Sequence, residues 1–75
     1  MTLADELTAL REAATPGKWD CYRPRASFAQ YHVFSEDQET LAVTPGHKAP
    51  ANANLIVALV NNLPEIVDAL RAVSQ

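Results

Sequence analysis

The chain has 75 residues, of which 48% are apolar and 20% are charged, and its net charge at pH 7 is −3. This composition is typical of a folded globular protein and excludes the polar, highly charged class of disordered chains. The length favours a single domain over residues 1–75, with a thin core that a homodimer or a large partner would help to stabilise. The negative charge argues against direct binding to nucleic acid, whose phosphates attract basic surfaces.

The first predicted element is an amphipathic helix that begins at Leu3 and ends near Ala14, because apolar residues recur between them at helical spacing. Thr2 is the expected N-cap, since acidic residues follow it in the first turn. The Thr-Pro-Gly run at 15–17 joins a residue restricted by proline to one that tolerates positive φ, which ends the helix.

Three short runs rich in aromatic and β-branched residues are the predicted strands: residues 18–22, 28–34 and 39–43. The connections at 23–27 and 35–38 are short, which favours antiparallel neighbours in a three-stranded meander. In the second run, alternation places Phe28, Gln30, His32 and Phe34 on one face and Ala29, Tyr31 and Val33 on the other.

Helical spacing returns after the loop at 44–50 and predicts two helices, at about 51–61 and 64–73. They meet at a bend, since Pro64 fits the first turn of a new helix. The apolar helix positions expected to be buried are Leu3, Leu7, Leu10, Leu55, Leu59, Leu63, Ile66 and Leu70.

The expected fold is therefore α+β, with an N-terminal helix, a three-stranded antiparallel sheet and two C-terminal helices packed on one sheet face. We expect the stripes of the first and last helices to cover that face. The opposite face then stays open, and that is where we look for function.

Motifs for catalysis are missing from the sequence. The chain has no nucleophile elbow, no glycine-rich phosphate loop and no zinc-ligand spacing, so we expect no enzyme, no cofactor and no metal. Cys21 is the single cysteine, which favours a reducing compartment, and we interpret it as a small structural residue. We interpret His32 as a half-buried sheet residue. Residues 1–6 lack the basic start of a signal peptide, and residues 49–64 are too short to cross a bilayer.

The β region is the predicted contact surface, because Trp, Tyr and Arg are enriched at binding hot spots and acidic side chains suit a basic groove. The alternatives are that Trp19 closes the core, that the aromatic residues pack among themselves, and that the acidic cluster is a solvated turn. The candidate partner-binding residues are Trp19, Tyr22, Arg23, Arg25, Tyr31, Glu36, Asp37 and Glu39.

Residues 10–19 read Leu-Arg-Glu-Ala-Ala-Thr-Pro-Gly-Lys-Trp and resemble the start of small phage and prophage proteins of the ead-like type. In those proteins a helix leads into Ala-Thr-Pro-Gly-Pro-Trp and a variable β region. Residues 51–58 and 63–70 resemble their Ala-rich and Leu-Pro-containing final helices. Lys18 stands where these proteins commonly have proline. The matching residues are helix ends, turns and apolar positions, so the resemblance assigns no catalytic residue.

The resemblance implies a phage accessory protein in the cytosol of a bacterial host, and small acidic proteins of that class often bind host proteins. We therefore expect an anti-defence, anti-CRISPR-like protein that binds a CRISPR–Cas effector and blocks its binding to target nucleic acid. The alternative is a non-enzymatic phage accessory protein that acts as a homo-oligomeric structural or regulatory module through its apolar C-terminal helices.

Overall fold

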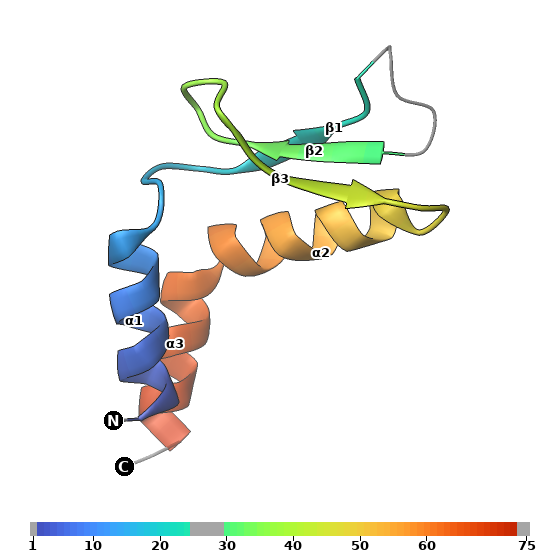
Figure 1. Cartoon of the computed structure of the whole chain (residues 1–75). Helices are drawn as coiled ribbons and strands as arrows, with labels where there is room; N and C mark the ends of the chain where they lie inside the picture. Colours follow the sequence, from blue (N-terminus) through green and yellow to red (C-terminus); the bar gives the residue numbers. More distant parts are fainter. Residues whose placement is uncertain (1, 25–29, 74–75) are drawn as a thin grey trace.

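The computed structural model describes residues 2–24 and 30–73. Its elements, in chain order, are α1 (Leu3–Ala13), β1 (Asp20–Tyr22), β2 (Gln30–Phe34), β3 (Thr40–Pro45), α2 (Ala49–Asn61) and α3 (Leu63–Val73). The strands form an antiparallel sheet in the order β1-β2-β3 (Figure 1). The α+β fold class, with one helix before the sheet and two after it, is confirmed.

The helices divide between two places in the molecule. Helix α2 lies along one face of the sheet, whereas α3 turns away from α2 by 64° and packs side by side with α1 (Figure 1). Of the two C-terminal helices, α2 is thus the one that covers the sheet. The expectation that the first helix covers the sheet is wrong, because the bend directs α3, and α1 with it, away from the strands.

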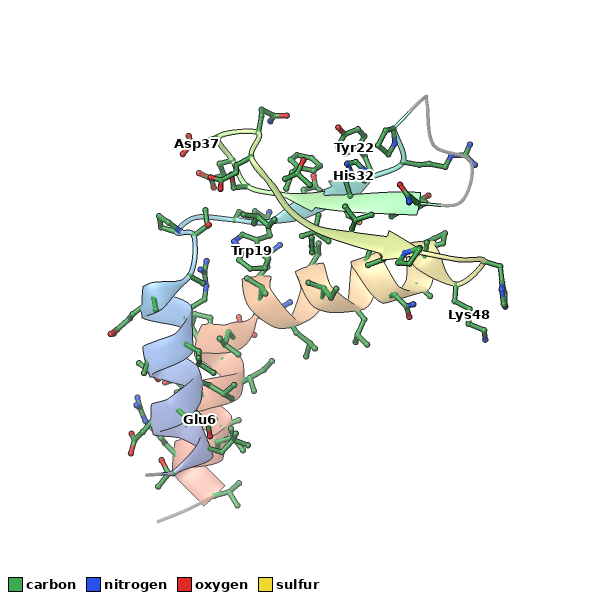
Figure 2. All side chains as sticks on the ribbon, viewed as in Figure 1. Glu6, Trp19, Tyr22, His32, Asp37 and Lys48 are labelled. Carbon is green, nitrogen blue, oxygen red and sulfur yellow. The ribbon has the colours of Figure 1, made fainter. Side chains whose placement is uncertain are left out.

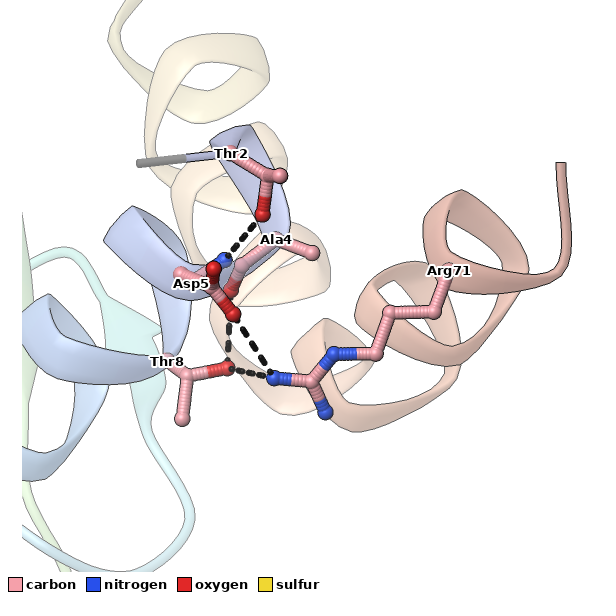
Figure 3. Close-up of polar contacts among 5 residues, drawn as sticks. All are labelled: Thr2, Ala4, Asp5, Thr8 and Arg71. Carbon is pink, nitrogen blue, oxygen red and sulfur yellow. Dashed lines mark hydrogen bonds and ion pairs between the residues drawn. The ribbon is translucent and has the colours of Figure 1, made fainter. Parts of the chain in front are cut away.

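One small side chain of each helix is buried where α1 packs on α3. Ala4 is the buried residue of α1 and Val67 that of α3. Near the start of α1, Arg71 Nη2 lies 3.5 Å from Asp5 Oδ1 and 3.4 Å from Thr8 Oγ1 (Figure 3). Both charged side chains are about half exposed, so their ion pair contributes less than about 1 kcal/mol. Packing of the helices therefore carries this contact.

The N-terminus of α1 has the predicted cap. The Thr2 hydroxyl accepts a hydrogen bond from the Asp5 N–H at 3.1 Å (Figure 3). At its other end the helix stops at Ala13, and the Ala14 N–H still donates to the Leu10 carbonyl at 3.0 Å. The predicted boundaries of this helix are confirmed.

The contact between α2 and the sheet is built from equally small side chains. Val33 in the central strand and Ala53 of α2 are both fully buried. Thr44 is buried as well, and its hydroxyl donates to the Ala49 carbonyl in the first turn of α2 at 3.0 Å. Alanines on the sheet side of α2 let the helix approach the strands closely.

None of the eight apolar positions expected to be buried is fully buried: four are exposed, and Leu7, Leu63, Ile66 and Leu70 are half-buried. Leu3, Leu10, Leu55 and Leu59 are 56%, 59%, 60% and 49% exposed. The apolar spacing along the helices is real, but the angle between α2 and the α1–α3 pair leaves part of the stripe in solvent. The buried core consists of alanine and valine instead.

The connection between α1 and β1 is fastened to the end of α2 and to the β2–β3 turn. The Asn61 side-chain amide accepts from the Trp19 N–H at 2.8 Å and donates to the Trp19 carbonyl at 2.7 Å. The Lys18 N–H donates to Glu36 Oε1 at 3.0 Å. Because these backbone groups are already bonded, pairing of β1 begins at Asp20 and not at Lys18 as expected.

Arg11 holds the first half of the same connection. Its guanidinium donates to the Thr15 carbonyl at 2.7 Å and to the Gly17 carbonyl at 2.6 Å. The Trp19 indole N–H donates to the Thr15 carbonyl at 3.0 Å, and the Arg11 guanidinium carbon lies 5.6 Å from the centre of the indole ring. The Ala-Thr-Pro-Gly-x-Trp motif is thus structural: it holds the connection between α1 and β1 in place.

Asn61→Ala tests this connection. The substitution removes two hydrogen bonds and leaves the half-buried Trp19 backbone groups without their partner, so we expect the free energy of unfolding to fall by about 1–3 kcal/mol. Asn62→Ala is the matched control, because the exposed Asn62 side chain bonds only to Ala58 within its own helix and its loss should cost under about 0.5 kcal/mol. Urea unfolding followed by the fluorescence of the single tryptophan measures both. Equal costs for the two variants would contradict the role of Asn61.

Candidate functional site

The sheet face turned away from α2 carries a row of aromatic and apolar side chains. Val33 is buried toward α2, and side chains alternate along a strand, so His32 and Phe34 point to the other face. The register places Tyr22 and Val43 opposite His32, on the two neighbouring strands. We call Tyr22, His32, Phe34 and Val43 the aromatic face; Figure 2 shows Tyr22 and His32 on the side of the sheet opposite α2.

The rings of the aromatic face contact one another. The Tyr22 ring meets the Phe34 ring edge to face, with centroids 5.0 Å apart and an interplanar angle of 84°. It lies 6.1 Å from the His32 ring at 66°. These contacts fix the ring orientations while Tyr22 and Val43 each remain 47% exposed. The result is a fixed apolar surface that is open to solvent.

Acidic side chains outnumber basic ones at one end of the sheet, where Lys18 is the exposed basic residue beside them. Exposed acidic residues gather where β2 turns into β3: Asp20, Glu36, Asp37 and Glu39. Exposed basic residues lie near the other end: Arg23 and Lys48. Asp37 and Lys48 appear at opposite ends of the sheet layer in Figure 2. A partner that covers the aromatic face would thus meet negative charge at one end.

The structure brings some of the predicted contact residues to this surface. Tyr22 belongs to the aromatic face, and Arg23 follows it in an exposed position. Asp37 and Glu39 are exposed in the acidic turn. Arg25 lies outside the described residues.

Three other predicted contact residues are placed differently. The Trp19 backbone is bound by Asn61, and its half-buried ring lies against Arg11, as expected for a residue that closes the core. Tyr31 stands opposite Thr44 in the register and therefore shares the face toward α2. Glu36 is exposed, but its carboxylate accepts the Lys18 N–H. Neighbours in the sequence do not share a face here, because strand side chains alternate.

His32, Phe34 and Val43 are surface residues that the sequence prediction left out of the contact site. The alternation of the second strand did place His32 and Phe34 on one face. What the sequence does not reveal is which of the two faces α2 covers, since both carry aromatic residues.

Cys21 lies on the covered side of the sheet. Its thiol is 3.4 Å from Asn54 Oδ1 of α2. Burial, and after it the negative charge of Asp20, raise the pKa of the Cys21 thiol above its ordinary value. The protonated thiol is therefore favoured, which disfavours reaction as a nucleophile. Among the described residues, no group of three His, Cys, Asp or Glu side chains could hold a metal ion.

The raised pKa predicts slow alkylation of Cys21. We expect alkylation of Cys21 by iodoacetamide to reach half of its maximal rate at a higher pH in the folded chain than in the chain unfolded in urea. Asp20→Asn should lower the half-maximal pH of the folded chain, but not to that of the unfolded chain. The neutral thiol contributes stability below the pKa of an unfolded cysteine, and this contribution is lost as the pH rises through the raised folded-state pKa. A half-maximal pH in the folded chain that is equal to or below that of the unfolded chain would contradict the raised pKa.

No single helix of the described chain is long and apolar enough to cross a membrane; α2 and α3 reach that length and composition only together, across their 64° bend. In comparisons with known proteins, the chain matches no family model, no curated sequence and no solved structure.

Proposed function

We propose that this chain is a non-enzymatic protein that binds a protein partner through the aromatic face and the acidic end of its sheet. Following the sequence resemblance, we further propose that it is a phage accessory protein in the cytosol of a bacterial host. There it binds an effector of the CRISPR–Cas class and blocks the effector's binding to target nucleic acid.

The observation that carries the proposal is the ring arrangement on the uncovered sheet face. Tyr22 is half exposed, yet its ring is already oriented by edge-to-face contact with Phe34. A side chain that is ordered before binding loses little conformational entropy in a complex. Aromatic residues also dominate the centres of protein interfaces. The aromatic face therefore has the properties of a preorganised interface core.

The acidic end suggests the chemistry of the partner. The exposed carboxylates of Asp37 and Glu39 lie beside the aromatic face and suit a surface rich in lysine and arginine. Proteins that bind nucleic acid hold its phosphates with such residues. A chain with a net charge of −3 that covers them would compete with the nucleic acid, and opposite charge would speed the encounter.

A second candidate function is a homo-oligomeric structural or regulatory module. The leucines that remain exposed on α1 and α2 favour it, since exposed apolar side chains in a group mark association surfaces. They lie on a different part of the molecule from the aromatic face, so the two functions can be tested separately.

Tyr22→Ala and Asp37→Lys test the contact surface. Each should weaken partner binding by more than about fivefold, because the first removes a hot-spot ring and the second reverses a complementary charge. Glu65→Lys on α3 is the matched control for charge reversal and should bind like the parent, since Glu65 is exposed and remote from the sheet. Circular dichroism verifies that each variant is folded.

The partner is sought by co-purification with a panel of host defence complexes, followed by a target-DNA binding assay with each complex that is captured. Capture of a CRISPR–Cas effector together with loss of DNA binding supports the proposal. If no complex is captured or inhibited, the anti-defence function is wrong. If Glu65→Lys abolishes binding while Tyr22→Ala and Asp37→Lys bind like the parent, the contact surface is helical.

A further inference from the structure

The helices carry a second surface of exposed apolar side chains, away from the sheet; Figure 1 shows α2 at an angle to the α1–α3 pair, with α3 leaving α2 on the side away from the sheet. Five large apolar side chains, each exposed by 49% to 85%, belong to it: Leu3, Leu10, Leu55, Leu59 and Val73. We call these five residues the inner apolar surface. They come from three helices, and their common side follows from helical spacing and from the contacts of each helix.

On α2 the two leucines point away from the sheet. Ala49 and Ala53 are the buried residues of this helix and face the strands, whereas Leu55 and Leu59 fall on the other side of the helix. Val73 lies on α3, beyond the bend, and is 85% exposed. Because α3 leaves α2 on the side away from the sheet, Leu55 and Leu59 lie on the inner side of the bend (Figure 1).

On α1 the leucines lie on the matching side of the helix pair. Thr8 of α1 and Asp68 of α3 line a common groove along one side of the α1–α3 contact. Leu3 and Leu10 are turned away from that groove by helical spacing, as Val73 is on α3. Leu3, Leu10 and Val73 thus lie on the side of the helix pair opposite this groove.

A single chain exposes more surface than is typical of a folded monomeric protein of the same mass. Its accessible area is 5484 Å², about 1000 Å² above the roughly 4500 Å² expected for a folded chain of 8.2 kDa. Its radius of gyration is 14.2 Å, against about 11 Å expected for a compact domain of this length. The excess area is similar to the roughly 800 Å² that each partner buries in a stable interface.

The inner apolar surface is suited to a second copy of the chain. The thirteen residues of α2 include no charged side chain, although half of this helix faces solvent. An uncharged apolar surface can pair with itself, whereas a surface that carried the acidic residues would repel its copy. We propose that two chains associate through their inner apolar surfaces in a two-fold symmetric dimer.

The dimer is independent of the proposed partner. The leucines lie on one side of helix α2, and its other side packs on the sheet. The aromatic face, on the far side of the sheet, therefore stays outside the dimer interface. Each dimer would carry two aromatic faces. A target with two equivalent sites would then be held by both chains at once, which raises the overall affinity without a new contact.

Light scattering on the full chain tests the dimer. The parent should have twice the 8.2 kDa chain mass, and the double variant Leu55→Asp/Leu59→Asp should have the mass of one chain. Val43→Asp is the matched control, since Val43 has similar exposure but lies on the aromatic face, and it should remain dimeric. Circular dichroism shows whether each variant is folded.

If the double variant fails to fold, a measurement on the parent still tests the dimer. The urea midpoint of a dimer rises with protein concentration, so we expect a higher midpoint when the concentration is raised a hundredfold. A parent with the mass of one chain and a midpoint independent of concentration overturns the dimer. So does a folded double variant that keeps the dimer mass, or loss of the dimer in Val43→Asp alone. None of these outcomes bears on partner binding by the aromatic face.

Discussion

The amide of Asn61 is the contact on which the arrangement of the two parts of the molecule depends. Asn61 ends α2, next to the bend into α3, and its side chain pairs with both backbone groups of Trp19 much as a neighbouring strand would. The chain on either side of Trp19 belongs to different parts, since α1 precedes it and β1 follows it. Binding this one residue therefore fixes the helix pair relative to the sheet at the point where both connections meet.

The sequence predicted the elements well where the signals are local. The cap at Thr2 and the new helix around Pro64 depend on residues within one turn, and both predictions are confirmed. The same reasoning applied to Pro50 would have started α2 at Ala49, because a proline in the first turn interrupts no hydrogen bond. The late start of β1 could not be predicted, since it depends on a side chain 42 positions away.

The candidate surfaces show what the periodicity of a sequence cannot predict. Spacing reveals which residues share a side of a strand or helix, but not which side another element covers. Tyr31 and His32 illustrate this: both are half buried, and only the position of α2 decides that His32 belongs to the open face. The leucines of α2 are the converse case, because a strongly apolar side was taken as buried while the alanines of the same helix form the contact with the sheet.

The distribution of side-chain sizes connects stability with association. Alanine and valine form the buried core, so each buried side chain removes little apolar area from water, whereas four leucines, which would remove more, remain exposed. A core of this kind in a chain of 75 residues supplies at most about 3–5 kcal/mol. In the proposed dimer, burial of the leucines by a second chain adds the missing area without involving the sheet. The proposed association thereby uses residues other than the rings that are proposed for recognition.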